Sequence, residues 1–385
     1  MNPKVCRLRL IFSTPVIMIM LISAISSNGC SSFRPARIAF LTSHKGIPHS
    51  DVVIMMDADG SELDELVSGT YIKPWNFPLC WSADRTRLLY IEGATRDREK
   101  WLSIVDSDGK SKHRILDISM KGVQGFSISP DGKTAILDYQ DLAEVVRDGE
   151  TNLEPYSPPS IISVNIESGK LTTLTNSDEI NASYPVFSPN GKRIAFIGRT
   201  DDPETHTDLY IMNSDGTNLK RMTHHHGIMF YPGNVLYWSP DCRKVLYVMM
   251  NNFVDSETFT DLFMANVTSG EESNLTKTES ETEMEPRWSP DGKLLAFTRL
   301  SGKYQTPSTI VMNAGGTHLK TVAKWFSSAS WLPNSRRLIG MGQTEESIPA
   351  IITIDIDGVN TEILLPFSVI ADNYSGMSYP MWLGE

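Results

Sequence analysis

Three Asp-x-Asp-Gly segments carry closely spaced carboxylates of the kind that bind divalent cations. They lie at residues 57–60, 106–109 and 355–358. A calcium loop of the EF-hand type places its glycine at position six and needs carboxylates at positions one and twelve. Here those positions hold apolar residues or a threonine: Met55, Ile104, Thr353, Leu66, Ile115 and Leu364. We therefore predict hairpin turns at these segments and no calcium sites.

A run of three histidines, His224, His225 and His226, is the second feature that could bind a metal ion. Imidazole is a common ligand for transition metals, but three adjacent side chains cannot readily face one ion. We expect a polar loop in which one imidazole faces a ligand. The sequence therefore predicts no metal site and no cofactor.

Catalytic groups are harder to find than possible metal ligands. The chain has no Gly-x-Ser-x-Gly segment, so the nucleophile elbow of the serine hydrolases is absent. The acidic stretches 201–204 and 279–285 are typical of a solvated surface. We assign no catalytic residue, and a peptidase is not expected.

The charge of the chain limits its partners. Its 385 residues carry 35 Lys and Arg against 46 Asp and Glu, a formal net charge of −11. An acidic surface repels phosphate backbones and anionic lipid headgroups. The balance excludes nucleic acid as a partner and excludes a polybasic membrane patch.

Residues 1–29 have the pattern of an export signal peptide. Lys4, Arg7 and Arg9 precede an apolar run at residues 10–25, and small or polar residues follow up to position 29. The chain is therefore expected to leave the cytoplasm for the periplasm or the cell surface.

The segment Ser27-Asn28-Gly29-Cys30 resembles the processing box of bacterial lipoproteins, although Ser27 stands where that family usually has leucine. In such proteins the cysteine receives lipid and becomes the new N-terminus. The resemblance implies lipidation at Cys30, a membrane anchor, and a short tether at residues 30–36. Ordinary cleavage after residues 24–26 and an uncleaved anchor are the alternatives.

Two cysteines, Cys80 and Cys242, lie well inside the part of the chain expected to fold. They belong to repeats that are far apart along the chain, beyond the reach of a disulfide in a ring of repeats. We predict packing residues and no structural disulfide, in spite of an oxidising compartment.

A repeated turn organises the rest of the chain. Segments of the Ser-Pro-Asp-Gly type begin at residues 82, 129, 188, 239, 289 and 332, in steps of 47, 59, 51, 50 and 43 residues. In such a turn proline fixes the backbone φ angle, the side chain of Asp or Asn can form a hydrogen bond with the nearby backbone, and glycine adopts a positive φ. A period of this length is typical of four-stranded propeller blades.

Short apolar strands follow each turn, and their continuous apolar character indicates burial on both faces. Second strands are expected at residues 88–90, 135–137, 194–197, 245–247, 294–297 and 338–339. Third strands are expected at 52–55, 102–105, 161–164, 208–212, 262–264, 309–312 and 351–354. The fold class is therefore all-β.

The two ends of the chain complement each other. Residues 37–40 match a second strand that no first strand precedes, while Tyr379, Pro380 and Trp382 match the first strand of the repeat at residues 184–187. We predict that the C-terminal strand completes the N-terminal blade and leaves no free sheet edge. Residues 37–385 would then form one seven-bladed β-propeller closed by this strand.

The repeats resemble those of the TolB-type, or PD40, propeller family, most clearly in the Trp-Ser-Pro-Asp-Gly-Lys motif with its following strand at residues 288–297. The resemblance covers nearly everything after residue 37 and implies the fold far more than an activity. TolB itself has six blades and a small α/β domain in front of them, so we expect a protein that is TolB-like but is not TolB.

Binding residues are expected at one end of the blades. The turns between first and second and between third and fourth strands are tight, whereas the other connections are long, as at residues 138–159 and 251–260. Long loops on a rigid scaffold commonly bind ligands. The candidates there are Trp75, His224, His225, His226 and Tyr231, although aromatic residues of this kind also pack their own loops.

Two classes of function fit these features. We predict a monomeric, non-enzymatic exported propeller that binds a protein or glycan partner at the cell envelope. The alternative is a carbohydrate-active propeller enzyme, similar to oligogalacturonate lyase or a glycoside hydrolase. That lyase binds its metal through ligands from separate blades, and no matching set is found here.

Overall fold

The structure is a computed structural model. It describes residues 37–43, 45, 51–70, 80–93, 99–147, 150–155, 157–200, 207–224, 236–254, 257–302, 306–373 and 378–384. The chain divides into the units Met1–Arg34 and Pro35–Glu385, and every described residue belongs to the second.

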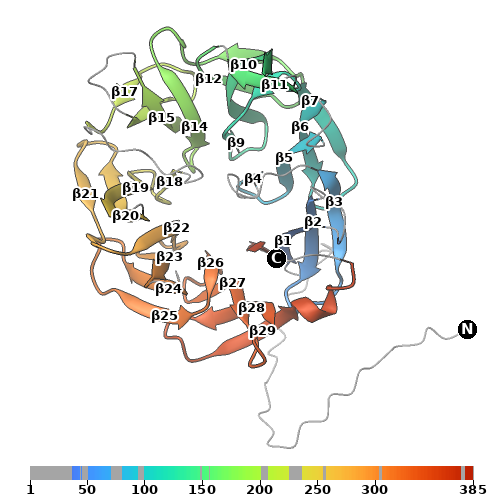
Figure 1. The fold of residues 1–385 in the computed structure, drawn as a ribbon, viewed down its shortest axis with the longest axis vertical. Coiled ribbons are helices and arrows are strands. Elements are labelled where there is room, and N and C mark those ends of the chain that lie inside the picture. Colours follow the sequence, from blue (N-terminus) through green and yellow to red (C-terminus); the bar gives the residue numbers. More distant parts are fainter. Residues whose placement is uncertain are drawn as a thin grey trace, which may run out of the picture. The chain divides into compact units, whose positions relative to one another are not determined.

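The described residues form strands joined by turns, with one short 3-10 helix, η1 (Phe367–Val369), near the C-terminus (Figure 1). The predicted all-β class is therefore confirmed. Within the described residues, no helix has both the length and the hydropathy needed to span a bilayer.

The strands in the described part of the chain form six hydrogen-bonded sheets. The first sheet has the order β3-β2-β1-β30, with β1 (Arg37–Ser43), β2 (Asp51–Asp57), β3 (Asp64–Thr70) and β30 (Ser378–Gly384). The second has the order β4-β5-β6-β7, with β4 (Cys80–Trp81), β5 (Arg87–Gly93), β6 (Lys100–Asp106) and β7 (Lys112–Asp117). The third contains β8 (Lys121–Gly122), β9 (Phe126–Ile128), β10 (Thr134–Arg147), β11 (Glu150–Pro155), β12 (Ser160–Asn165) and β13 (Leu171–Thr173).

The remaining strands form three further sheets. The fourth sheet contains β14 (Asn181–Phe187), β15 (Arg193–Arg199), β16 (Asp208–Asn213) and β17 (Lys220–Arg221). The fifth contains β18 (Tyr237–Trp238), β19 (Lys244–Val254), β20 (Glu257–Asn266), β21 (Glu272–Asn274), β22 (Thr282–Trp288), β23 (Leu294–Ser301), β24 (Thr306–Asn313) and β25 (Lys320–Lys324). The sixth contains β26 (Ser327–Trp331), β27 (Arg337–Gln343), β28 (Pro349–Asp355) and β29 (Thr361–Pro366).

The fifth sheet consists of two antiparallel groups, β18–β21 and β22–β25. They are joined where β20 pairs with β22 in parallel, with Thr260 opposite Thr282. The side chain of Thr260 is buried and donates a 2.6 Å hydrogen bond to the carbonyl oxygen of Glu283. This single parallel contact fuses two repeats into one sheet.

The first sheet brings the two ends of Pro35–Glu385 together. β30, at the end marked C, lies beside β1 (Figure 1). The two strands pair antiparallel, with Ile38 opposite Trp382 and Ala39 opposite Met381. The backbone of the predicted C-terminal strand therefore lies where the sequence places it. The side chains of Tyr379, Pro380 and Trp382 lie outside the description.

The predicted second and third strands are confirmed, because each lies within β1, β5, β10, β15, β19, β23 and β27 or within β2, β6, β12, β16, β20, β24 and β28. Two of the connections that were expected to be long loops contain strands instead. β10 continues to Arg147 and pairs with β11, and β19 continues to Val254 and pairs with β20. These segments extend the sheets as hairpins beyond the short apolar runs from which the strands were predicted.

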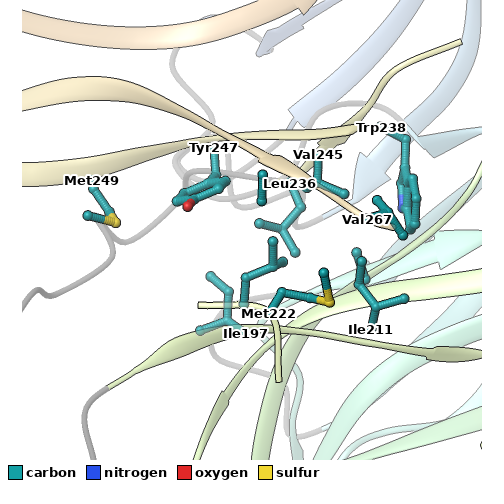
Figure 2. Packing of buried hydrophobic residues seen from close by; sticks show 12 residues of the cluster. Ile197, Ile211, Met222, Leu236, Trp238, Val245, Tyr247, Met249 and Val267 are labelled. Carbon is teal, nitrogen blue, oxygen red and sulfur yellow. The ribbon is translucent and has the colours of Figure 1, made fainter. Parts of the chain in front are cut away.

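The core lies between neighbouring sheets. Ile197 and Ile211 of the fourth sheet pack against Val245, Tyr247 and other residues of the fifth, as Figure 2 shows. A similar cluster joins the first sheet to the sixth through buried aliphatic side chains. Because both faces of the middle strands are covered, each of these strands contains a continuous run of buried apolar residues, as the sequence indicated.

Candidate functional site

The first strands of several sheets end around one cavity of about 710 Å³, which we call the turn-side cavity. Six aromatic residues contribute to its wall: Trp81, Phe187, Tyr237, Trp238, Trp288 and Trp331. The prolines of the repeated turns also line it, at positions 130, 189, 240 and 290. A cavity of this size can hold a small ligand or a few side chains of a partner.

Three of the tryptophans are fixed by bonds to the preceding repeat. Trp238 donates its indole N–H to the carbonyl of Val186 at 3.2 Å, and Trp288 donates to Tyr237 at 3.2 Å. Trp331 donates in the same way to Arg287 at 3.1 Å. These N–H groups are already satisfied, so these side chains offer a ligand apolar ring surface and no donor.

The serines and aspartates of the repeated turns also have internal partners. In the third sheet, Ser129 Oγ donates to Asp131 Oδ1 at 2.6 Å, and Asp131 accepts the backbone N–H of Lys133 at 3.1 Å. The hydrogen bond from Ser129 lowers the pKa of Asp131 below its usual range. The same Ser-to-Asp bond recurs in the fifth sheet, between Ser289 and Asp291. These groups therefore stabilise turns and are poorly placed for acid–base chemistry.

Two arginines, Arg85 and Arg287, also line the turn-side cavity. The described lining contains no Asp, Glu, Asn, Gln, His or Lys. Arg287 lies over the ring of Tyr237, with its guanidinium carbon 4.6 Å from the ring centroid. Burial lowers the pKa of Arg85 from its ordinary value. An arginine keeps its charge in such surroundings, so the cavity is apolar with positive charge at its wall.

A second group of ionisable residues lies on β22, on β23 and at Glu281, directly before β22. Arg299 donates to Glu283 at 2.6 Å through Nη2 and lies 2.8 Å from Glu281 through Nε. Glu283 is 0% exposed, and its Oε2 atom has no hydrogen-bond partner. Burial, opposed by the bond from Arg299, raises the pKa of Glu283 to about 7. Because a substrate cannot reach a fully buried carboxyl, this group is a structural one.

Most of the predicted binding residues lie outside the described residues: Trp75, His225, His226 and Tyr231, together with Cys30. His224 is described and is exposed at the surface. Among the residues that the structure describes, no three His, Cys, Asp or Glu side chains are grouped to hold a metal ion. Binding by the long loops therefore stays a prediction, and the turn-side cavity is the candidate site that the described residues form.

The three Asp-x-Asp-Gly segments are hairpin turns, as predicted. In the first of them Gly60 has φ +83° and donates its N–H to the carbonyl of Asp57 at 2.9 Å. Asp59 accepts bonds from the backbone and the hydroxyl of Ser61. The Asp59 carboxylate is thus bonded within the turn, and the Asp57 carboxylate lies 3.6 Å from Nε of Arg37 on β1.

Cys80 and Cys242 are free thiols, and burial raises the pKa of Cys80 to about 12.

Comparison with known proteins identifies the family. A family model described as the TolB beta propeller domain matches residues 82–369. The chain belongs to the TolB β-propeller family. The match includes five of the six aromatic residues of the turn-side cavity together with both arginines, Trp81 lying one residue before its start. The predicted relation to this family is confirmed.

Two relatives within the TolB β-propeller family are the Tol-Pal system proteins TolB of Francisella tularensis. The protein of subspecies mediasiatica strain FSC147 is 30% identical over 225 residues, which cover 57% of this chain and 45% of the relative. That of subspecies holarctica strain OSU18 is 28% identical over 286 residues, which cover 71% and 59%. The chain thus spans about half the length of these curated relatives.

Solved structures share the fold. An oligogalacturonate lyase from Vibrio parahaemolyticus has a TM-score of 0.58 and 16% identity, with 83% of this chain and 91% of that chain covered. A puromycin-hydrolysing peptidase from Mycobacterium tuberculosis has a TM-score of 0.58 and 12% identity, with 85% and 53% covered. At these identities the likeness concerns the fold alone.

Sequence reasoning missed the turn-side cavity because it assigned the aromatic residue before each turn to the strand only. The signal is visible in the repeat. Trp81, Phe187, Trp238, Trp288 and Trp331 all stand directly before the first residue of a turn. Residues at equivalent positions of stacked repeats lie at the same end of the array.

Proposed function

We propose that this chain is an exported, monomeric β-propeller that binds a protein or glycan partner at the cell envelope and performs no chemistry on it. The observation that carries this proposal is the turn-side cavity, whose described wall combines aromatic rings and two arginines with serines already bonded within turns. Such a wall can hold a partner, but it offers no nucleophile activated by a base.

We also propose that the repeats form seven blades and that β30 closes them into a ring. The pairing of β30 with β1 supports closure, and the split of the fifth sheet into two four-strand groups supports the count. The turn-side cavity would then be one mouth of the central channel. The loops that carry Trp75, His225 and Tyr231 would lie at the other mouth.

The cellular location of the chain is part of the same proposal. The signal-like segment at residues 1–29 supports export, and Cys30 would carry the lipid anchor. The relatives named Tol-Pal system protein TolB support an envelope protein as the partner. The partner itself is expected to differ, since the identity is low and the lengths are unequal.

Site-specific photo-crosslinking in the native host tests this function. A benzoylphenylalanine at Ala83, an exposed residue at the cavity wall, should give a discrete adduct with an envelope component. The same group at Lys170, exposed in the turn between β12 and β13, is the control. Absence of any adduct from Ala83, or equal adducts from both positions, would contradict binding through this cavity.

The alternative is a carbohydrate-active propeller enzyme. The structural likeness to an oligogalacturonate lyase favours testing this activity first. Incubation of the purified chain with oligogalacturonate, with and without added manganese, would release an unsaturated product that absorbs ultraviolet light if the chain were a lyase. Release at a rate that scales with protein concentration would replace the binding proposal with the enzymatic one.

A further inference from the structure

One tryptophan, Trp325, lies at the surface at the end of the sheets opposite the turn-side cavity. It stands between β25 and β26, whereas the turns that line the cavity are at the other end of these strands. The residue is 53% exposed, and it is the only aromatic among the exposed large apolar residues of the described chain. Because tryptophan is highly buried on average, this exposure needs a physical cause.

The connection that carries Trp325 is short and fixed. Two residues, Trp325 and Phe326, separate β25 from β26. The backbone N–H of Trp325 donates a 2.7 Å hydrogen bond to the carbonyl oxygen of Pro307. The carbonyl oxygen of Phe326 accepts a 2.7 Å bond from the hydroxyl of Thr309. A side chain on a backbone fixed in this way loses less conformational freedom when a ligand binds it.

The packing of Phe326 explains why the neighbouring ring faces water. Phe326 is 1% exposed and belongs to the apolar cluster between the fifth and sixth sheets. It fills a space that two glycines of β27 leave open. A Cβ on Gly340 would lie 2.6 Å from Cε2 of Phe326, and a Cβ on Gly342 would lie 3.5 Å from its Cδ2. Since Phe326 occupies this space, the ring of Trp325 lies outside the cluster.

The backbone at Trp325 is a feature that another connection shares. Its φ is +58°, in the left-handed region that bulky side chains rarely adopt. Lys277, in the connection between β21 and β22, also has a positive φ, of +52°. The conformation therefore belongs to the repeats, and what distinguishes this connection is the exposed indole.

The polar surroundings of Trp325 indicate the class of ligand. Lys324 and Ser327 flank the connection, and their side-chain nitrogen and oxygen have no hydrogen-bond partner in the described part of the chain. A protein interface usually has an apolar centre wider than one ring between polar neighbours. A pyranose has a small C–H face that an indole covers, and hydroxyl groups at its edge that bond to lysine and serine. The surface therefore suits a sugar better than a protein.

We propose that Trp325 is the stacking residue of a glycan-binding site. The C–H face of a pyranose lies on the indole, and Lys324 and Ser327 bond to the hydroxyl groups of the sugar. The site is separate from the turn-side cavity and performs no chemistry, so it goes beyond the binding proposed for that cavity. The pyranose ring is common to neutral and acidic sugars, and the test distinguishes them.

The test uses the full mature chain in calorimetric titrations with three trisaccharides. Cellotriose is neutral, tri-N-acetylchitotriose carries acetamido groups, and trigalacturonate is acidic. We expect at least one of them to bind. Trp325→Asn removes the ring and should weaken that binding at least about tenfold, whereas Trp325→Phe keeps a smaller ring and should weaken it less. Preference for trigalacturonate that added salt reduces would mean that Lys324 binds a carboxylate.

The matched control is His318→Asn. His318 is exposed, has a φ of +57° and lies in the turn between β24 and β25, at the other end of β25. The two variants thus place the same residue at the same backbone conformation on opposite ends of one strand. Both should stay folded, with a cooperative melting transition, and sugar binding should fall in Trp325→Asn alone.

Three results would overturn the proposal. Binding of none of the three trisaccharides would refute a sugar site at Trp325. Binding that is unchanged in folded Trp325→Asn would place the sugar elsewhere on the chain. Equal weakening by His318→Asn would show that the loss is not specific to the ring. None of these results changes the adduct expected from Ala83, so they leave the proposed binding through the turn-side cavity intact.

Discussion

The indole nitrogen of Trp238 donates a 3.2 Å hydrogen bond to the carbonyl oxygen of Val186, 52 residues earlier in the chain. The ring is 7% exposed and belongs to the same apolar cluster as Ile211 and Val267 (Figure 2). One side chain thus stabilises the contact between the fourth and fifth sheets in two ways, through packing and through a bond to a backbone acceptor.

Replacing Trp238 should separate these two contributions. Trp238→Phe keeps most of the buried area and loses the hydrogen bond, which should reduce the free energy of unfolding by about 1 kcal/mol. Trp238→Ala also leaves a cavity and should cost about 3 to 5 kcal/mol. Urea unfolding measures both. Trp81→Phe is the control: the Trp81 indole N–H is buried and has no hydrogen-bond partner, so its loss should cost less. Equal costs for the two Phe variants would contradict this account.

Removal of the C-terminal strand should destabilise the whole chain. A chain that ends at residue 377 lacks β30 and exposes the edge of β1, where Ile38 and Ala39 pair with Trp382 and Met381. An unpaired apolar edge promotes aggregation. We expect a large fall in melting temperature or visible aggregation, followed by thermal denaturation and light scattering, with a milder defect for Trp382→Ala. A melting temperature within a degree or two of the full chain would mean that β30 does not close the ring.

The free energy of unfolding should fall as the pH rises towards the pKa of Glu283. Its pKa is about 7 in the folded chain and 4.5 in an ordinary glutamate, so the folded state binds this proton more tightly. Stability is then greatest below pH 4.5 for this group and decreases up to about pH 7, by up to about 3 kcal/mol. Urea unfolding at a series of pH values measures the slope.

Glu283→Gln is the matched variant for this slope. It keeps the shape of the side chain and cannot ionise, so stability should no longer fall between pH 6 and 7. The titration of Asp138 lies below this pH range. Burial raises the pKa of Asp138 only to about 6, so its contribution to stability changes between pH 3.8 and 6. An unchanged slope between pH 6 and 7 in Glu283→Gln would assign the titration to another group.

Cys30 should carry the lipid anchor. Cys30→Ala should release soluble protein from membranes or leave an uncleaved precursor. Intact-mass measurement of the mature native chain should show an acylated N-terminal cysteine. An unmodified N-terminus at any other residue would exclude lipidation and leave ordinary cleavage.

The two proposed binding ends can be compared directly. Alanine at Trp75, His225 and Tyr231 should weaken the native partner if the long loops bind it, and Arg85→Gly should weaken it if the turn-side cavity does. Surface loop substitutions usually change stability by less than about 0.5 kcal/mol, so melting temperatures should stay similar. Footprinting that protects only the turns around Asp131 and Asp291 would exclude the long-loop site.

Much of the fold could be predicted from the sequence, because it repeats and because each repeat uses local rules. Ser129 and Asp131 form their turn within a few residues, and the apolar strands at residues 135–137 and 194–197 are buried on both faces in the structure. The hairpin β10–β11 was missed because it extends beyond the apolar run at residues 135–137 from which the strand was predicted.

The site was harder to predict because its residues meet only through the arrangement of whole repeats. Trp81 and Trp331 are 250 residues apart and line one cavity, and no local pattern in either segment indicates that they do so. Arg85 stands at the fourth position of a repeated turn, which other repeats fill with glycine or with Cys242 and Ser335. Only the three-dimensional structure shows that its side chain lines the cavity.

The parallel contact between Thr260 and Thr282 has a consequence for how the chain opens. Elsewhere neighbouring repeats are joined by side-chain packing and by individual hydrogen bonds such as that of Trp238 to Val186, whereas here a strand of one repeat pairs with a strand of the next. We therefore expect residues 237–324 to open as one cooperative unit, so that their slowest backbone amides show a common opening free energy in hydrogen exchange. If force is applied to the two ends of the chain, this double repeat should unfold in one event. The length of chain released in that event should be about twice the length that a neighbouring repeat releases.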